Sequence, residues 1–254
     1  MSVPLVVKVG GSTLGSADTS FADIASLALA GDVPVVVHGG GAEATSWLEH
    51  MGIESRFERG KRVTDENALP VVVAVFAGLV NKRVVAAIGA SGAAACGLSG
   101  VDADVLECTI PDPSLGFVGK PLRVQTTALD ILREAGVIPV VAPVGFVPRE
   151  GERTLVNVNA DTVAGSVAAA MKAREVIFLT DVEGVRERDG SPVSSLTRER
   201  AKSLIADGTI AGGMIPKVQA CLHAAALGVP ARITDGRVRG ALLDRDYGGT
   251  VFVP

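Results

Sequence analysis

Two glycine clusters stand directly after short apolar runs, and a lysine precedes the first of them. The first cluster lies in Lys8-Val-Gly-Gly-Ser12 and the second in His38-Gly-Gly-Gly41. Because glycine has no Cβ, backbone N–H groups can approach phosphate oxygens there, and a following helix adds its positive N-terminal end. An isolated glycine pair would indicate only a tight strand-to-helix turn. Two clusters and an adjacent lysine predict a phosphate-binding site.

The elements that must position these clusters can be predicted from periodicity. Short β-branched runs, typical of buried parallel strands, occupy residues 3–9, 33–37, 93–98, 137–141 and 176–179. Helical spacing between the first two runs predicts a helix with Ser20 as its N-cap and Gly31 as its stop. A second helix with a polar cap is predicted over residues 159–171. Both glycine clusters then lie at carboxyl ends of strands, where open α/β sheets bind ligands.

Composition indicates the same fold class. Of the 254 residues, 48% are hydrophobic but only 4% are aromatic, so Ala, Val, Leu and Ile must fill the core. We expect an α/β fold, a three-layer αβα sandwich around a mainly parallel sheet. A single domain is expected, with an N-terminal lobe to about residue 147 and a C-terminal lobe over about 148–254. Hairpin signals rich in Gly, Pro and charge lie at residues 56–62, 112–124 and 186–192.

Charge and cysteine usage exclude several classes of protein. The net charge of -4 disfavours a nucleic-acid or anionic-membrane partner, because both require clustered Lys and Arg. Cys96, Cys108 and Cys221 have no CxxC or His spacing, which indicates reduced thiols rather than disulfides or a zinc site. The start of the chain has no leader pattern, and no run reaches about 18 apolar residues. We expect a cytoplasmic protein.

The common nucleotide motifs are missing. No G-x-G-x-x-G follows a strand and no G-x-x-x-x-G-K-[ST] occurs, so neither a dinucleotide fold nor a P-loop enzyme is supported. Eight short motifs, in their order and spacing, resemble the amino-acid kinase family and within it the acetylglutamate kinases. They are residues 8–12, 37–41, 62–65, 78–82, 97–102, 157–161, 179–184 and 212–217. Uridylate kinases and aspartokinases are similar around the first motif but not around residues 62–65 and 157–161.

The resemblance implies ATP-dependent phosphorylation of the γ-carboxylate of N-acetyl-L-glutamate, which gives N-acetyl-L-glutamyl 5-phosphate in arginine biosynthesis. It implies ATP with Mg²⁺ carried by the nucleotide, and no metal site of the protein's own. A carboxylate is ionised at neutral pH, so it can attack the γ-phosphorus without a general base. The enzyme must then align two anions and neutralise charge on the transferring phosphoryl group.

The resemblance also implies roles for individual residues. The predicted catalytic residues are Lys8 and Lys217, which contact the phosphoryl group, and Asp161, which holds their ammonium groups. The predicted substrate-binding residues are Gly40 and Gly41 through their backbone, Arg62 at the α-carboxylate and Asn157 at the acetylamido-glutamate body. The predicted nucleotide-binding residues are Gly10, Gly11, Asp181, Val182, Gly184, Val185, Thr209, Ile210 and Ala211. His38 is predicted to be a packed, hydrogen-bonded imidazole with no catalytic role.

Two departures from the family pattern border the expected acceptor pocket. Ala103 stands where many relatives have glycine, and Gly41 is followed by Ala42-Glu43 rather than Pro-Gln. The acyl-amino-acid substrate is therefore less determined than the reaction type.

An alternative acceptor is aminoadipate or glutamate attached to an acidic carrier protein, in lysine or arginine biosynthesis. A basic cluster of Arg56, Arg59, Lys61 and Arg62 fits such a carrier, although a solvated hairpin face explains it equally simply. A more distant alternative is a non-catalytic nucleotide-binding regulator that retains only the fold. The presence of both predicted catalytic lysines argues against it.

Assembly can also be predicted. Residues 69–88 contain more hydrophobic surface than one helix face needs, so part of this segment is expected to be buried against a second subunit. Burial within one subunit is the alternative. Arginine-inhibited acetylglutamate kinases carry an extra N-terminal helix, whereas seven residues precede Lys8 here. We therefore expect a homodimer that is insensitive to arginine.

Overall fold

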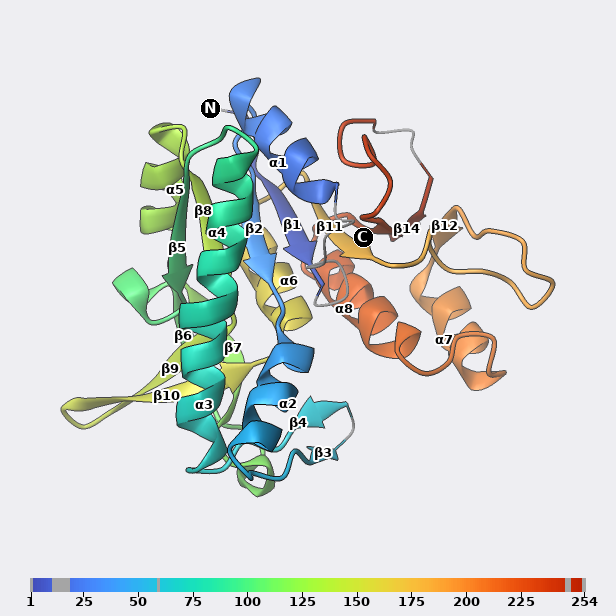
Figure 1. Ribbon diagram of the computed structural model, residues 1–254. Helices are drawn as coiled ribbons and strands as arrows, with labels where there is room; N and C mark the ends of the chain where they lie inside the picture. The colour runs from blue at the N-terminus through green and yellow to red at the C-terminus, as the bar shows by residue number, and fades with distance from the viewer. Residues whose placement is uncertain (1, 11–18, 59, 245–247, 253–254) are drawn as a thin grey trace.

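The protein is built around an eight-stranded sheet, seen in a computed structural model that describes residues 2–10, 19–58, 60–244 and 248–252. The strands of this sheet are β1 (Leu5–Val9), β2 (Val35–His38), β5 (Ala95–Ser99), β8 (Ile138–Ala142), β11 (Glu175–Thr180), β12 (Ser195–Leu196), β13 (Ala231–Asp235) and β14 (Thr250–Phe252). Their order is β12-β14-β13-β11-β1-β2-β8-β5 (Figure 1). Of the neighbouring pairs, β13 and β14 are antiparallel and the others are parallel. The prediction of a mainly parallel sheet is confirmed.

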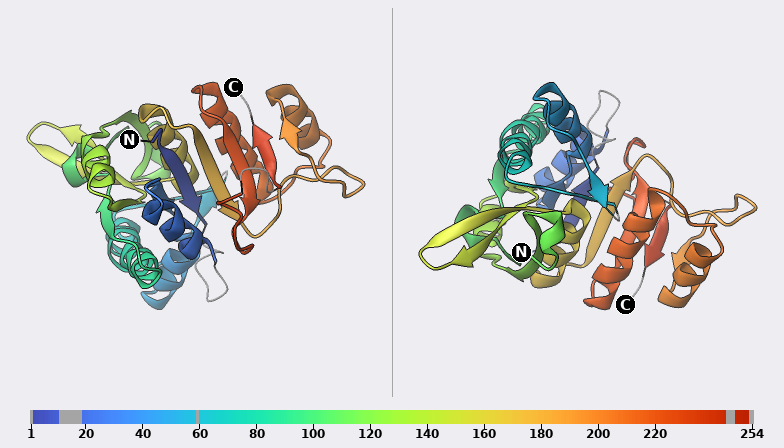
Figure 2. Two further views of the ribbon diagram at one scale, coloured as in Figure 1. Left: turned by 90° about the horizontal axis from the view of Figure 1, so that it is seen from above. Right: turned by 90° about the horizontal axis from the view of Figure 1, so that it is seen from below.

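Helices cover both faces of the sheet (Figure 2). One layer consists of α1 (Ser20–Leu29), α2 (Gly41–His50), α3 (Ala68–Val73), the π-helical segment η2 (Ala74–Val80) and α4 (Asn81–Ala90). The other consists of α5 (Thr127–Glu134), α6 (Ala160–Ala170), α7 (Arg198–Ala206) and α8 (Met214–Ala226). Short 3₁₀ turns are η3 (Asp102–Asp104) and η4 (Pro113–Leu115). The three-layer αβα sandwich is therefore confirmed.

The central strand shows why the apolar runs are continuous. On β1, Val6 belongs to the core cluster under α6, whereas Val7 belongs to the cluster under α1. Successive side chains of a strand point to opposite faces, so a strand covered on both faces must be apolar at every position. Each of the five predicted strands is confirmed to within two residues at its ends.

Helix ends follow the predicted caps with one correction. The prediction of Ser20 as N-cap is wrong, because Ser20 is the first helical residue of α1 and Thr19 precedes it as the N-cap. Both residues are capping types, so the sequence alone could not separate them. Gly31 follows α1 with φ 85°, as a helix stop requires. Asn159 caps α6 as predicted, its Oδ1 accepting from the Thr162 N–H at 3.0 Å.

A small four-stranded barrel lies beside the main sheet. Its strands are β6 (Leu106–Thr109), β7 (Val118–Val124), β9 (Val144–Arg149) and β10 (Glu152–Val158), and a separate hairpin joins β3 (Phe57–Glu58) to β4 (Lys61–Arg62). The hairpin predicted at residues 56–62 is thereby confirmed, and an antiparallel bridge joins the ends of 186–192. Strands β6 and β7 follow each other in the chain and pair antiparallel around residues 110–117, so the signal at 112–124 also marks a hairpin. The parallel pairing of β7 with β10 has no local turn signal, because these two strands are far apart in the chain.

Residues Ala68–Ala90 form one long apolar helix across α3, η2 and α4. By length and composition this segment could cross a membrane, but 44% of its most apolar window is buried inside the structure. A core helix of a soluble protein passes the same test, so the feature is weak support for a membrane span. Val72, Val84 and Ile88 anchor this helix in the core.

The turn after β5 provides the first prediction. Ala103 has φ 48° although it is not glycine, a conformation that costs an L-residue roughly 1 to 2 kcal/mol. We expect Ala103→Gly to raise the free energy of unfolding by about 1 kcal/mol, measured by urea denaturation. The control is Ala86→Gly at an exposed position of α4, which should lower it by about 0.5–1 kcal/mol. Equal destabilisation by both changes would contradict this account.

Candidate active site

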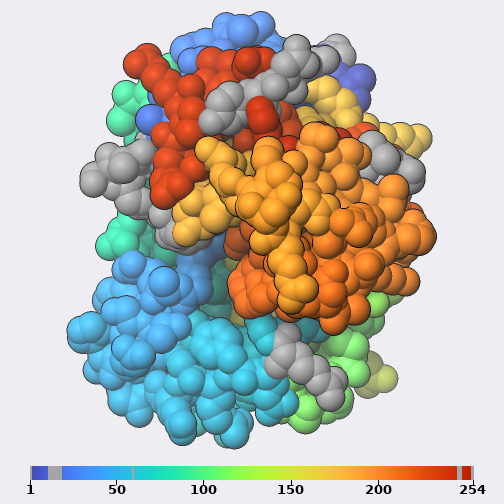
Figure 3. All heavy atoms as spheres, turned by 90° about the vertical axis from the view of Figure 1, so that its right-hand side faces the viewer, coloured from blue at the N-terminus to red at the C-terminus, as the bar shows by residue number. Residues whose placement is uncertain are grey.

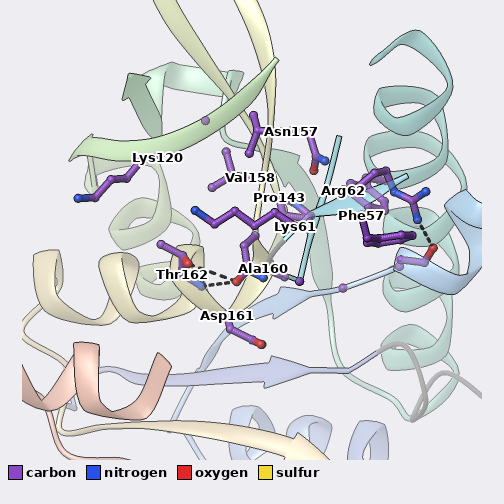
Figure 4. A pocket seen from close by; sticks show the side chains of 18 of the residues that line it. Phe57, Lys61, Arg62, Lys120, Pro143, Asn157, Val158, Ala160, Asp161 and Thr162 are labelled. Atoms are coloured by element: carbon purple, nitrogen blue, oxygen red, sulfur yellow. Dashed lines mark hydrogen bonds between the residues drawn. The ribbon is translucent and has the colours of Figure 1, made fainter. Parts of the chain in front are cut away.

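A cavity of about 210 Å³ opens at the carboxyl ends of β1 and β2. The start of α6, the β3–β4 hairpin and strands β7 and β10 complete its wall (Figure 4). Six of the predicted site residues line it together: Lys8, Gly40, Gly41, Arg62, Asn157 and Asp161. Their positions in the sequence span more than 150 residues, and the sheet edge is what brings them to one place.

A buried ion pair lies at the base of this cavity. Lys8 Nζ on β1 is 2.7 Å from Asp161 Oδ1 on α6, and each residue is 8% exposed. Asp161 Oδ1 makes no well-aligned hydrogen bond despite this distance, so the contact is a pairing of charges rather than an oriented bond. The carboxylate also lies in the first turn of α6, where the helix dipole favours negative charge. The pairing keeps the Lys8 ammonium in the cavity.

Arg62 is held by the start of α2. Its Nη2 donates to Gly41 O at 2.9 Å and to Thr45 Oγ1 at 2.6 Å, and its Nη1 donates to Ser55 Oγ at 2.8 Å. The guanidinium stacks over Phe57 with 4.6 Å to the ring centre. Burial lowers the pKa of Arg62 from its usual value. The three bonds leave two of the five guanidinium N–H groups for a ligand.

Asn157 is positioned by the barrel. Its Nδ2 donates to Thr64 Oγ1 at 2.9 Å, and its backbone N–H donates to Phe117 O. Thr64 Oγ1 donates in turn to Arg62 O at 3.1 Å, so the predicted carboxylate-binding and amide-binding residues are connected. The Asn157 Oδ1 oxygen is available as an acceptor for an amide N–H.

Two further lysines, which the sequence had not indicated as ligand-binding residues, also line the cavity. Lys61 of β4 extends into the cavity, whereas Lys120 of β7 lines it with its ammonium directed away from the other labelled side chains (Figure 4). Lys61 belonged to the predicted basic cluster, whereas Lys120 had no signal of its own. The charged side chains of the lining are then four cations, Lys8, Lys61, Arg62 and Lys120, against the single carboxylate of Asp161. Such a cavity attracts anions.

Lys217 lies outside this lining, on α8. Pro216, the residue before Lys217, lies close to Gly60 at the tip of the β3–β4 hairpin, because a Cβ on Gly60 would be 3.9 Å from the proline ring. The charges of Lys217 and Asp161 both act on the thiol of Cys221, one turn further along α8, while burial raises its pKa well above the usual value. Among the described residues there is no ion pair between Lys217 and Asp161. On the surface, a recess separates the cyan region that contains the β3–β4 hairpin from the orange C-terminal part of the chain (Figure 3).

A second cavity of about 270 Å³ lies in the C-terminal half. Its lining includes the predicted nucleotide-binding residues Gly184 and Val185, together with Arg186, Pro192, Val193 and residues 248–250. Thr250 Oγ1 organises the wall, accepting from the Val185 N–H at 2.8 Å and donating to Val193 O at 2.6 Å. A Cβ on Gly184 would lie 2.8 Å from Thr250 Oγ1, so glycine is required there. The sequence had given no signal for residues 248–250.

The other predicted nucleotide-binding residues that the structure describes lie outside the lining of both cavities. Gly10 directly follows β1 and is buried. Asp181 O, at the end of β11, accepts from Arg237 Nη2 at 2.6 Å. Val182 is partly exposed beside it, and residues 209–211 connect α7 to α8 with Ile210 buried in the core. Gly11 and Arg59 lie outside the described residues. Within the described part of the chain, no group of three or more His, Cys, Asp or Glu side chains could hold a metal ion.

His38 is packed as predicted. It is completely buried at the end of β2, and its Nδ1 lies 2.7 Å from Gly39 O. Burial, together with the charges of Lys8 and Lys82, lowers the pKa of His38 from 6.5 to about 4. The imidazole is therefore neutral at physiological pH.

This pKa predicts a stability change in acid. Between about pH 6.5 and 4 the unfolded chain binds a proton at His38 that the folded chain does not, so stability falls as the pH is lowered through this window. We expect wild type to lose about 2–3 kcal/mol more than His38→Asn between pH 7 and 4.5. Urea denaturation at several pH values measures the difference. Parallel stability curves for the two proteins would contradict the assignment.

Comparisons with known proteins agree with this geometry. Residues 4–235 match the model of the amino acid kinase family. The chain is 47% identical over 243 residues to the acetylglutamate kinase of Cereibacter sphaeroides (strain ATCC 17029 / ATH 2.4.9), covering 94% of this chain and 82% of the relative. It is 42% identical over 236 residues to the acetylglutamate kinase of Dehalococcoides mccartyi (strain BAV1), covering 92% and 87%.

Solved structures agree on the fold. The crystal structure of smu.665 from Streptococcus mutans UA159 superposes with a TM-score of 0.84 at 25% identity and covers 98% of both chains. Giardia carbamate kinase superposes with a TM-score of 0.71 at 16% identity, covering 99% of both chains, which concerns the fold alone. With the family model matched over residues 4–235 and relatives 42–47% identical over more than 90% of its length, the chain belongs to the amino acid kinase family.

Proposed function

We propose that the protein phosphorylates the γ-carboxylate of N-acetyl-L-glutamate with ATP, producing N-acetyl-L-glutamyl 5-phosphate for arginine biosynthesis. The observation that carries the proposal is the cavity whose lining contains the four cations Lys8, Lys61, Arg62 and Lys120 and a single carboxylate, that of Asp161. A dicarboxylate acceptor and a triphosphate donor are both anionic and need such a surplus of positive charge. Relatives 42–47% identical over nearly the whole chain carry the name acetylglutamate kinase.

The chemistry needs no general base. A γ-carboxylate oxygen attacks the γ-phosphorus, the bond to the β-phosphate oxygen breaks, and ADP leaves. Lys8 neutralises charge on the transferring group and is itself held by Asp161. Lys217 approaches from α8 on the side of the nucleotide. Mg²⁺ comes with the nucleotide phosphates and neutralises part of their charge when bound.

The two substrates are proposed to bind on opposite sides of the sheet edge. Arg62 receives the α-carboxylate and Asn157 the acetylamido group, within the acceptor lobe that extends to about residue 147 and the adjoining strand β10. The nucleotide lies over the C-terminal lobe, residues 148–254, where the cavity beside Gly184 and Thr250 receives its base or ribose. We place the enzyme in the cytoplasm, with ATP.

A hydroxamate assay tests the function directly. Purified protein with ATP and MgCl₂ should form an acyl phosphate, trapped by hydroxylamine, from N-acetyl-L-glutamate but not from aspartate or free glutamate. Absence of acyl phosphate with every acceptor would reject the proposal.

A specific observation favours a second acceptor. Arg56 and Lys61 are exposed at the β3–β4 hairpin, so positive charge extends from the cavity to the surface beside it. This arrangement suits glutamate or aminoadipate linked to an acidic carrier protein. The same assay with carrier-linked acceptors separates the two, because the better acceptor has the higher kcat/KM.

A homodimer is proposed from an apolar groove on the outer face of the long helix. The groove, about 520 Å³, is lined by Trp47, Met51, Pro70, Val71, Ala74, Val75 and Leu79. Trp47 and Met51 are 46% and 59% exposed, which is unusual for such large apolar side chains on a monomer. A second copy of the same face is the simplest cover, since most closed assemblies are two-fold.

The lysines give the first functional prediction. We expect Lys217→Ala, and separately Lys8→Ala, to lower kcat by about 100-fold or more while the KM for N-acetylglutamate changes far less. The reason is that both charges act mainly on the transition state. Lys202→Ala, at an exposed position of α7, is the control and should keep wild-type kcat. A wild-type kcat in either variant would remove that lysine from the mechanism.

Arg62 should behave differently. Arg62→Lys keeps the charge but loses the planar donor array and the stacking on Phe57, so affinity for N-acetylglutamate should fall about tenfold, more than kcat falls. Isothermal titration measures the affinity, and Arg56→Lys on the same hairpin is the control. An unchanged affinity in Arg62→Lys would show that Arg62 is not the carboxylate-binding residue.

The apolar groove predicts the oligomeric state. Light scattering should give a dimer for wild type and a monomer for Met51→Glu, because a charge in the groove cannot be buried without a partner. The matched control is Leu227→Glu, a 47% exposed leucine on the opposite face, which should stay dimeric. A monomeric wild type, or a dimeric Met51→Glu, would reject the interface.

A further inference from the structure

One buried side chain connects three neighbouring strands below the cavity. Asn81, the first residue of α4, is completely buried. Its Nδ2 lies 3.0 Å from Val140 O on β8, 3.3 Å from Leu98 O on β5 and 3.2 Å from His38 Nε2 on β2. Its Oδ1 accepts from Lys82 Nζ at 3.0 Å. A fully bonded buried amide of this kind specifies one arrangement of the strands it joins.

The surrounding backbone is shaped to admit Asn81. A Cβ on Gly97 of β5 would lie only 1.9 Å from Asn81 Oδ1, so glycine is required there. The π-helical segment η2 ends immediately before Asn81, and π-helical turns occur frequently at functional sites. Phe76 and Val80 of η2 pack against Gly40, where a Cβ would lie 3.1 to 3.2 Å from them. The segment η2 therefore contacts Gly40 with its side chains and ends directly before Asn81, whose position it sets.

The hydrogen-bond partners of His38 determine which of its nitrogens carries the proton. Gly39 O can only accept, so the neutral imidazole carries its hydrogen on Nδ1 and donates it to Gly39 O at 2.7 Å. His38 Nε2 is then an acceptor and lies 3.2 Å from Asn81 Nδ2, whose two N–H groups are shared among this nitrogen and two backbone carbonyls. The Gly39 N–H donates to Val9 O at 2.9 Å, so both polar groups of Gly39 are engaged.

This bond fixes the direction of the next N–H group. In a planar trans peptide the C=O of Gly39 and the N–H of Gly40 point in opposite directions. Because Gly39 O is drawn toward the buried ring, the Gly40 N–H points away from that ring, and Gly40 itself lines the cavity. Among the described residues no acceptor is recorded for the N–H of Gly40 or Gly41, as at the start of any helix.

We propose that His38 and Asn81 are positioning residues, which hold the Gly40 N–H toward the transferring phosphoryl group. The inference rests on the proposed kinase function and deepens it. A peptide between two glycines flips easily when unrestrained, because neither residue has a Cβ to oppose rotation. A donor preorganised where negative charge redistributes lowers the barrier without reorganisation during the reaction.

Two substitutions of His38 test the proposal by its geometry. The amide nitrogen of Asn occupies the place of Nδ1, whereas that of Gln reaches the place of Nε2. His38→Asn should keep kcat within about threefold of wild type, and His38→Gln should lower it about tenfold or more, with KM for N-acetylglutamate nearly unchanged in both. His50→Gln, at an exposed histidine of α2, is the control and should keep wild-type kcat.

Each outcome decides the question. A wild-type kcat in His38→Gln, or an equal loss of kcat in both variants, would overturn the proposal. A purely structural role of His38 would not distinguish a nitrogen at the Nδ1 position (Asn) from one at the Nε2 position (Gln). If His38→Gln fails to fold, ¹⁵N NMR of wild type replaces it. The His38 ring should then show the Nδ1–H tautomer from pH 5 to 9, and an Nε2–H tautomer would overturn the proposal. An inactive wild type would instead reject the kinase function itself.

Discussion

The buried ion pair between Lys8 and Asp161 joins the central strand of the sheet to the start of α6. Removing either partner would leave an unpaired charge in a site that is nearly closed to water, which costs several kcal/mol. The pair can be buried because the sheet places β1 and the α6 N-terminus side by side and the helix dipole supports the carboxylate. The cavity is built around the ammonium group that this arrangement keeps in place.

The rest of the site adds positive charge around that centre without a competing base. Arg62 is fixed by Gly41 O and Thr45, Asn157 by Thr64, and the lysines of β4 and β7 also line the cavity. A reaction between an ionised carboxylate and a phosphoryl group needs alignment and charge neutralisation rather than proton transfer. The chemistry of the lining and the chemistry of the proposed reaction therefore agree.

The backbone positions that only glycine can occupy shape the site together with its side chains. Gly97 leaves room for Asn81, Gly184 leaves room for Thr250, and Gly40 packs on the π-helical segment. At Gly97 and Gly184 a methyl group would collide with an atom that organises the site, and at Gly40 it would crowd the side chains of Phe76 and Val80. The low aromatic content also favours this close packing, because small aliphatic side chains allow helices to approach both faces of a parallel sheet.

The sequence by itself determined the fold class, the five main strands and the two glycine clusters with Lys8 at the sheet edge, because buried parallel strands are apolar at every position and glycine clusters mark their carboxyl ends. Arg62, Asn157 and Asp161 were predicted only through the resemblance of their motifs to those of a known family. Only the tertiary structure decided the pairing of β7 with the distant strand β10, the place of Lys120 in the cavity lining, and the wall that residues 248–250 give to the second cavity. It also decided that His38 donates to Gly39 O and presents its other nitrogen to Asn81. These features depend on contacts between residues far apart in the chain, which local periodicity and spacing do not encode.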